Sequence, residues 1–225
     1  MSQFTWDDYK KSLKDLSFGS LPEHLEAPKT KDIIIDTRTD KKNMWFLPIR
    51  GKNYNGHDFI EKAFREKKII GAFCEREELD RFSPQIQKNL IVVSCALKAL
   101  QKIAMENRKK ATSGIVFAIT GSVGKTTTKN MLEAIVKQTK APYVASEKNY
   151  NNEIGVPLTL LKVEPKHKFI VLEMGARKQG DIRELTQIAK PNISICLNVG
   201  SSHLSTFKDK NAIYKTKLEA RALKG

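Results

Sequence analysis

The chain has 225 residues, of which 40% are hydrophobic and 29% are charged, a composition ordinary for a globular protein of one large domain or of about one and a half ordinary ones. The net charge of +15 and the pI of about 9.7 would permit nucleic-acid binding, but no predicted helix has a basic face interleaved with aromatic residues, so we expect no nucleic-acid partner. The first residues lack the apolar core of a signal peptide, and no apolar run approaches the ~20 residues of a membrane helix. Because the cysteines also form no CxxC pair, the sequence predicts a cytoplasmic protein without membrane insertion.

The N-terminal part is predicted to combine helices with short strands. A helix is expected to begin after Thr5, a residue suited to an N-cap, and to place Trp6, Tyr9 and Leu13 on one face. The next elements expected are strands over 33–36, 44–49, 69–73 and 90–93 and helices over 59–68 and 96–108.

The polar stretch 106–114 is predicted to be a linker, which gives an N-terminal domain over 1–108 and a second domain over 109–225. In the second domain strands are expected over 114–120, 142–145, 169–175 and 193–200, with helices after the first strand, over 180–190 and from about 211. The helix after the first strand is expected to direct Met131, Leu132, Ile135 and Val136 inward. Strands that alternate with helices predict an α/β fold with a parallel sheet.

The segment GSVGKTT (121–127) follows a predicted strand and opens a predicted helix, which is the context of a phosphate-binding loop. In such a loop Lys125 would reach the β- and γ-phosphates, and the hydroxyl of Thr126 would hold Mg²⁺. The residues expected to bind the phosphates are Gly121, Ser122, Gly124, Lys125, Thr126 and Thr127. Because Ile119 stands where the strict pattern has a glycine, this loop is a variant, and a plain glycine turn is the alternative.

Two further candidate residues lie at the C-terminal ends of predicted strands, at the edge where a parallel sheet places its chemistry. Glu173 closes the segment FIVLE, and its carboxylate would suit Mg²⁺, although a cap for the next turn is the alternative. His203 follows the last predicted strand, but a lone histidine is more often an ordinary hydrogen-bonded residue.

Taken together, TGSVGKTTTKNML, NYNNEIGVPLTLL, VLEMGARKQGDI, NVGSSHLSTF and KTKLE resemble the Mur ligases, cytoplasmic ATP-dependent enzymes that build the peptide stem of peptidoglycan. The N-terminal segments DTR (36–38), FLPIRG (46–51) and NGHDFIEKA (55–63) look like the UDP-binding domain of that family. Among the members of the family, the sequences of NYNNEIGVPLTLL and VLEMGARKQGDI are most similar to those of the ligase that joins D-Ala-D-Ala to UDP-MurNAc-tripeptide. The resemblance therefore implies a small UDP-binding domain followed by an ATP-binding domain.

The resemblance also implies a reaction and its cofactors, ATP and Mg²⁺. The γ-phosphate would pass to a carboxylate of the nucleotide-linked peptide, and the amine of D-Ala-D-Ala would attack the resulting acyl phosphate. The implied catalytic residues are Lys125, Glu173, His203 and Lys217. Thr126 and Glu173 would hold one Mg²⁺ and His203 a second, with Lys217 as a further metal ligand if it is carbamylated. The residues implied to bind the substrate are Asn151 and Asn152 and, for the UDP-sugar, Thr37, Arg38, Asn55, Gly56 and His57.

Mur ligases are longer, three-domain proteins, so the resemblance implies that the central domain is incomplete at Gly225. We therefore expect the chain alone to be poorly active or inactive as a ligase. A truncated, non-catalytic module that binds UDP-MurNAc-peptide or ATP is the alternative. An unrelated P-loop NTPase would explain neither NNEIGVPLTLL nor the pair formed by His203 and Lys217. The sequence leaves the oligomeric state open.

Overall fold

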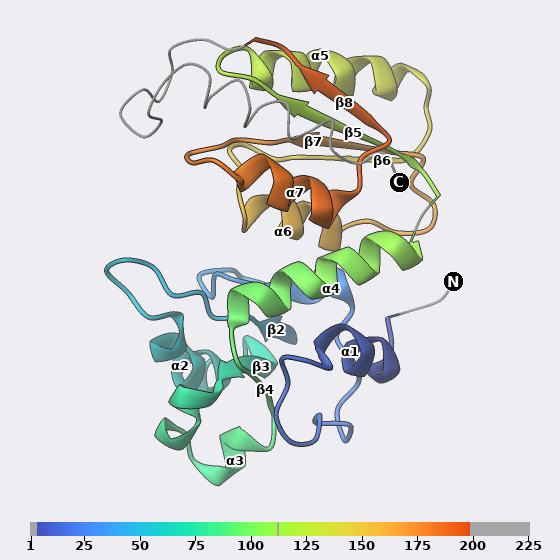
Figure 1. The fold of residues 1–225 in the computed structure, drawn as a ribbon. Helices are drawn as coiled ribbons and strands as arrows, with labels where there is room; N and C mark the ends of the chain where they lie inside the picture. Colours follow the sequence, from blue (N-terminus) through green and yellow to red (C-terminus); the bar gives the residue numbers. More distant parts are fainter. Residues whose placement is uncertain (1–3, 112, 199–225) are drawn as a thin grey trace. The chain divides into compact units, whose positions relative to one another are not determined.

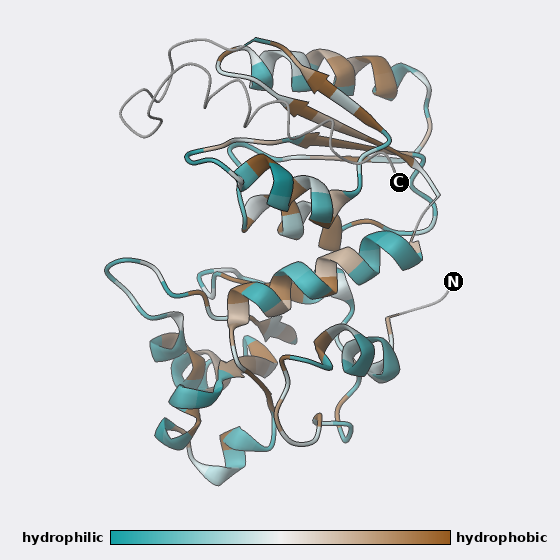
Figure 2. Ribbon diagram, viewed as in Figure 1, coloured by the Kyte–Doolittle hydropathy of each residue, from teal (hydrophilic) through white to brown (hydrophobic). Residues whose placement is uncertain are grey.

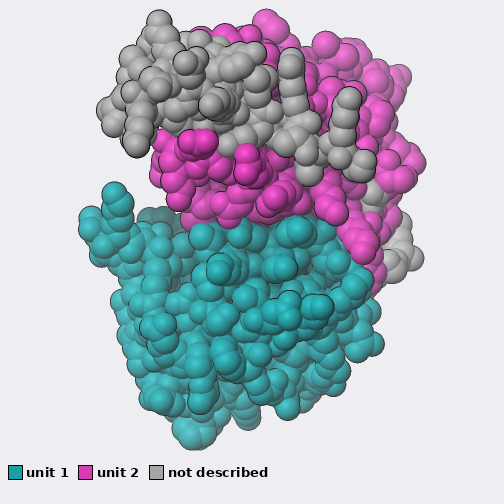
Figure 3. Space-filling model, in the orientation of Figure 1, with its two compact units in different colours: residues 1–106 teal, residues 107–225 magenta. Residues whose placement is uncertain are grey.

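The computed structural model describes residues 4–111 and 113–198, and the chain divides into two compact units (Figures 1 and 3). The first unit runs to Glu106 and the second begins at Asn107, so the division falls inside helix α4 (Ala96–Ala111). The predicted linker is therefore partly wrong. The helix continues past residue 108 because the residues up to Ala111 include good helix formers and basic side chains, which suit the C-terminal end of the helix dipole.

The first unit contains a four-stranded parallel sheet in the order β1-β2-β3-β4. Its strands are β1 (Ile33–Ile34), β2 (Met44–Phe46), β3 (Ile69–Glu75) and β4 (Leu90–Val93). Besides α4 it has helices α1 (Trp6–Leu13), α2 (Ile60–Arg65) and α3 (Pro84–Gln87) and the 3-10 helices η1 (Thr30–Asp32), η2 (Gly56–Phe59) and η3 (Arg76–Arg81). Strand β2 is shorter than predicted, since Pro48 has no N–H for a ladder.

Helix α1 confirms the expected start and the expected buried face. Thr5 and Asp8 form a capping box, in which the Thr5 side chain accepts from the Asp8 N–H and the Asp8 carboxylate accepts from the Thr5 N–H. Tyr9 and Leu13 are fully buried, and the ring of Trp6 packs edge-on against Trp45 of β2 with 5.7 Å between the ring centres. The helix is thereby fixed to one face of the sheet.

The second unit is a parallel sheet in the order β6-β7-β5-β8, with α5 on one face and α6 and α7 on the other (Figure 1). Its strands are β5 (Ile115–Thr120), β6 (Tyr143–Ala145), β7 (Phe169–Glu173) and β8 (Ile193–Cys196), and its helices are α5 (Lys125–Gln138), α6 (Gly155–Leu161) and α7 (Asp181–Ala189). Hydrophobic residues are concentrated on the central strands β5 and β7 (Figure 2). Two parallel four-stranded sheets confirm the predicted α/β fold class.

Helix α5 corrects one expectation. Of the apolar residues expected to point inward, Val136 is buried and Leu132 packs partly against the sheet, but Met131 is 62% and Ile135 64% exposed. These residues form two parallel i, i+4 rows about 100° apart around the helix, and only the row of Leu132 and Val136 faces the strands.

Strand β8 ends at Cys196 rather than near residue 200, because the N–H of Leu197 makes its last bond to the Thr120 carbonyl and the chain then turns to the loop after β5. The helix expected from about residue 211 lies outside the described residues. Within the part of the chain that is described, no helix combines the length and the apolar character needed to cross a bilayer.

Candidate functional site

The candidate residues of the second unit gather at the carboxyl edge of its sheet. The loop 121–127 follows β5, and Glu173 ends the neighbouring strand β7. Asn151 lies in the segment after β6, and Asn198 follows β8 on the other side of β5. All strands of this sheet run parallel, so these four chain segments meet at one edge, where open α/β sheets bind ligands.

The loop has the backbone geometry of an anion site. Gly124 adopts φ +83° and is the N-cap of α5, and Gly121 adopts φ +155°, conformations that residues with a Cβ rarely take. Helix α5 begins directly afterwards at Lys125, so its first N–H groups, which have no acceptor within the helix, lie at the loop. A helix start of this kind favours a phosphate.

Lys125 lies folded over the same loop. Its ammonium donates to the carbonyls of Gly121 (2.8 Å) and Ser122 (3.1 Å). An ammonium has three N–H donors, so one remains for a ligand even while both loop contacts are kept. The loop thus holds a positive charge beside the helix start.

Glu173 is 2% exposed, and both of its carboxylate oxygens are engaged. The Thr126 hydroxyl donates to Oε2 and the Asn151 amide donates to Oε1, each at 2.8 Å. The N–H of Glu173 itself donates to the hydroxyl of Ser146, at the end of β6, at 3.2 Å. A buried carboxylate is therefore fixed beside the hydroxyl at the start of α5.

The pair formed by Thr126 and Glu173 fits Mg²⁺ in its chemistry. A hydroxyl and a carboxylate are hard oxygen ligands, and their oxygens lie 2.8 Å apart at a helix start suited to binding phosphate. The described residues contain no cluster of three or more histidine, cysteine, aspartate or glutamate side chains that could hold a metal by itself. The other expected ligands, His203 and Lys217, lie outside the described residues.

A hollow of about 160 Å³ opens beside Lys125. Its lining consists of Lys125, Asn151, Asn152, Glu153, Gly175, Ala176, Arg177 and Asp181. The side-chain oxygen of Asn152 accepts from the N–H groups of Ile154 (3.2 Å) and Gly155 (2.9 Å), so this residue also holds the start of α6. The structure thus brings Lys125 and the two predicted asparagines to one hollow.

Sequence reasoning gave no role to Arg177, Ser146 or Asn198, which the structure places at this edge. A position at the end of a predicted strand, the criterion that found Glu173, could have pointed to Ser146, whereas Asn198 lay inside the strand predicted over 193–200. Asp181 lies in the first turn of α7, where a negative charge suits the helix dipole. Its carboxylate also accepts from the N–H groups of Arg177 (2.8 Å) and Lys178 (2.9 Å) and so fixes the loop before that helix.

In the first unit Arg38 is exposed, and its guanidinium forms a two-point ion pair with the carboxylate of Asp36. The Arg38 guanidinium lowers the pKa of that carboxyl. The Asp36 carboxylate also accepts from the Arg38 N–H at 3.0 Å, a turn that ends β1 earlier than predicted. Thr37 and Arg38 therefore lie on a turn after β1, while Asn55, Gly56 and His57 lie around the start of η2.

His57 is fully buried, and both of its ring nitrogens are engaged. Nε2 accepts from the N–H of Glu75 (3.0 Å), so the proton of the neutral ring resides on Nδ1, which donates to the side-chain oxygen of Asn55 (2.8 Å). The Asn55 amide donates in turn to the carboxylate of Glu78 (2.9 Å), to which Arg50 donates at 2.6 Å. His57 thus positions Asn55 at the end of β3.

This arrangement predicts a pH dependence of stability. Burial lowers the pKa of His57 below its ordinary value of 6.5, so the unfolded chain takes up a proton more readily than the folded chain. The contribution of His57 to stability is therefore complete above about pH 6.5 and is lost as the pH falls toward the lower pKa of the folded state. We expect His57→Gln to lower the free energy of unfolding at about pH 7.5 but to flatten its decline toward about pH 5.5.

Tryptophan fluorescence during urea unfolding measures this effect selectively, because both tryptophans, Trp6 and Trp45, lie in the first unit. The matched control is His167→Gln, since burial also lowers the pKa of His167 but this residue lies in the second unit. An unchanged decline in the His57 variant would contradict the prediction.

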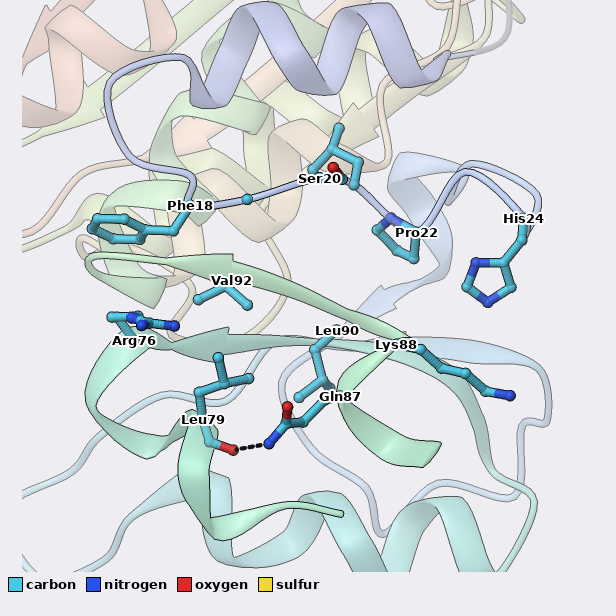
Figure 4. Close-up of a pocket in the computed structure, with 12 residues that line it drawn as sticks. Phe18, Ser20, Pro22, His24, Arg76, Leu79, Gln87, Lys88, Leu90 and Val92 are labelled. Atoms are coloured by element: carbon cyan, nitrogen blue, oxygen red, sulfur yellow. Dashed lines mark hydrogen bonds between the residues drawn. The ribbon is translucent and has the colours of Figure 1, made fainter. Parts of the chain in front are cut away.

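A second hollow, of about 570 Å³, lies along β4 in the first unit (Figure 4). Phe18 forms one side of it, and its N–H donates to the carbonyl of Val92 at 2.9 Å. Arg76, Leu79 and Lys88 line the opposite side. None of the predicted UDP-sugar residues lines this hollow, so it is distinct from the turns after β1 and before η2.

Comparison with known proteins gives consistent matches. Residues 119–220 match the Mur ligase middle domain. The UDP-N-acetylmuramoyl-tripeptide–D-alanyl-D-alanine ligase of Synechocystis sp. is 37% identical over 207 residues, which are 92% of this chain and 44% of that protein. The chain therefore spans less than half the length of this relative.

Solved structures extend the likeness to both units. A crystal structure of MurF from Acinetobacter baumannii has a TM-score of 0.83 at 27% identity and covers 99% of this chain and 47% of that one. The MurF ligase from Thermotoga maritima in complex with ADP has a TM-score of 0.74 at 32% identity, over 86% of this chain and 44% of that one. The chain belongs to the Mur ligase family and is MurF-like over the N-terminal and middle domains.

Proposed function

We propose that this chain supplies the UDP-sugar-binding part and the ATP-phosphate-binding part of a ligase that joins D-Ala-D-Ala to UDP-MurNAc-tripeptide in the cytoplasm. The observation that carries the proposal is the contact of Thr126 with the buried Glu173 at the start of α5, beside Lys125. This arrangement suits a nucleotide phosphate with Mg²⁺, and the Thermotoga relative was solved with ADP.

In the proposed reaction the chain contributes positioning and charge. The N–H groups at the start of α5 and the ammonium of Lys125 would bind the phosphates and stabilise the charge that develops on the transferred group. Thr126 and Glu173 would hold Mg²⁺, which when bound neutralises charge on the phosphate oxygens. Asn151 keeps the Glu173 carboxylate oriented, and its place in the hollow beside Lys125 suits contact with the substrate carboxylate that accepts the phosphoryl group.

The first unit would bind the UDP-sugar at the carboxyl ends of β1 to β3. Arg38 is exposed there, and its solvent-exposed ion pair with Asp36 can be exchanged for a phosphate. Asn55 presents a side chain that His57 and Glu78 hold in place. Thr37 and Gly56 are neighbours of these residues in the chain. His57 itself contacts protein atoms, so we assign it a supporting role in this binding.

A non-catalytic module that binds the same ligands is the second candidate, and the observation that favours it is the 44% coverage of the Synechocystis ligase. Phosphate release from ATP separates the two candidates. We expect the chain alone to release phosphate weakly at most when UDP-MurNAc-tripeptide and D-Ala-D-Ala are both present. Rapid release that requires both substrates would refute the non-catalytic candidate. Calorimetry that detects no binding of either UDP-MurNAc-tripeptide or ATP to the folded chain would refute both.

A further inference from the structure

We infer that Asn198 is a positioning residue of the phosphate loop: it holds Ser122 and Val123, so that the N–H groups that follow them are left to bind the phosphate. This inference rests on the proposed function and deepens it. It divides the amides of the loop between a structural task and a binding task.

Among the described residues, the hydrogen bonds of Asn198 are directed at two consecutive residues of the loop, Ser122 and Val123. Its side-chain oxygen accepts from the N–H groups of Ser122 (3.2 Å) and Val123 (3.1 Å), and its side-chain amide donates to the carbonyl of Val123 (3.1 Å). The backbone carbonyl of Asn198 also accepts from Ser122 at 3.1 Å. Both polar groups of the Val123 peptide backbone are therefore bonded to one side chain.

Only a primary amide of this length can both accept from the N–H of Val123 and donate to its carbonyl. Asparagine offers a carbonyl oxygen and an NH₂ group on a short stem, so it can accept from and donate to the same residue. An aspartate could accept the two N–H bonds but could not donate to Val123, and it would place a negative charge next to a phosphate site. Alanine could do neither.

Leu197, the preceding residue, supports the same part of the loop by packing. Its N–H donates to the carbonyl of Thr120 at 3.0 Å, which continues the pairing of β8 with β5. A Cβ added at Gly121 would lie 3.1 Å from the Cβ of Leu197. The end of β8 therefore borders the loop from Thr120 to Val123.

The consequence is that the N–H groups of Ser122 and Val123 are engaged before any ligand arrives. The first helical bond of α5 runs from the N–H of Thr128 to the carbonyl of Gly124 at 2.9 Å, so the earlier N–H groups of this helix have no acceptor within it. Those of Lys125, Thr126 and Thr127 are therefore the groups left for the phosphate. A loop held in this shape in advance loses less conformational entropy on binding.

The test compares Asn198→Ala and Asn198→Asp with a matched control, Asn192→Ala. Asn192 precedes β8 as Asn198 follows it, and its side chain accepts from the N–H of Val116 at 2.8 Å, at the opposite edge of the sheet. We expect Asn198→Ala to weaken the binding of Mg-ADP about tenfold, because it removes three side-chain hydrogen bonds from a preorganised loop. Asn198→Asp should weaken it at least as much, and Asn192→Ala by less than about twofold.

Hydrogen exchange of the loop amides, followed by NMR without nucleotide, provides a second readout. Exchange at Val123 should accelerate in Asn198→Ala but stay slow in Asn198→Asp, which keeps the side-chain acceptor. Exchange at Ser122 should change less, because its N–H also donates to the backbone carbonyl of residue 198, which both variants keep. Unchanged Mg-ADP affinity, or tighter binding, in Asn198→Ala would overturn the inference, and so would unchanged exchange at the Val123 amide. If the wild-type chain binds no Mg-ADP, the proposed function is contradicted instead. In that case the exchange measurement still tests the role of Asn198, and a wild-type exchange pattern in Asn198→Ala would refute it.

Discussion

Lys125→Ala is expected to weaken the binding of Mg-ATP by about a hundredfold, the largest effect that we predict for any single substitution in this chain. The ammonium lies over the loop, bonded to the carbonyls of Gly121 and Ser122, and would make charge-assisted hydrogen bonds to the phosphates. Calorimetric titration measures the affinity. Lys125→Arg, which keeps the charge but not the compact ammonium, should recover only part of it.

Lys137→Ala is the control for this prediction. Lys137 is exposed in the last turn of the same helix, so its removal takes away one positive charge without altering the loop. Its affinity for Mg-ATP should equal that of the wild type. If Lys125→Ala binds Mg-ATP within about threefold of the wild type, the phosphates do not bind at this loop.

Glu173→Gln is expected to abolish the enhancement of nucleotide affinity by Mg²⁺. The substitution keeps the size of the side chain but removes the charge that would hold the metal beside the Thr126 hydroxyl. Glutamine has a single carbonyl oxygen, and its NH₂ group cannot accept, so the side chain can no longer accept from both Thr126 and Asn151. We therefore also expect a loss of stability of about 1–3 kcal/mol, typical for a buried donor left without an acceptor.

Titrations with ADP, with and without Mg²⁺, check the effect on the metal. Glu147→Gln is the matched control, because Glu147 is exposed and pairs with Lys162 away from the loop. This variant should respond to Mg²⁺ as the wild type does. A Glu173→Gln variant that remains folded and keeps the full Mg²⁺ enhancement would show that Glu173 does not hold the metal.

Local sequence signals predicted much of the fold because each depends on neighbours in the chain. Thr5 and Asp8 are three residues apart, so their capping box can be read directly from the sequence. The alternation of apolar runs with helical patterns predicted parallel strands, and the rule that ligands bind at strand ends then placed Glu173 beside the loop before Thr126.

The remaining features depend on contacts between distant segments. Nothing near Met131 or Ile135 in the sequence shows which row of α5 faces the sheet. Asn198 lies 75 residues beyond Val123 and meets it only because β8 pairs with β5. His57 was expected to bind substrate, but its burial follows from the approach of η2 to the end of β3, which no local pattern shows.

The central claim is that the loop after β5 binds a nucleotide phosphate with Mg²⁺. Its most direct test is an NMR titration of the ¹⁵N-labelled chain with Mg-ADP. We predict that the largest changes in amide chemical shift occur at residues 124–127 and saturate at one nucleotide per chain, with little change in the first unit. Shifts confined to other residues, or none at saturating Mg-ADP, would contradict the claim.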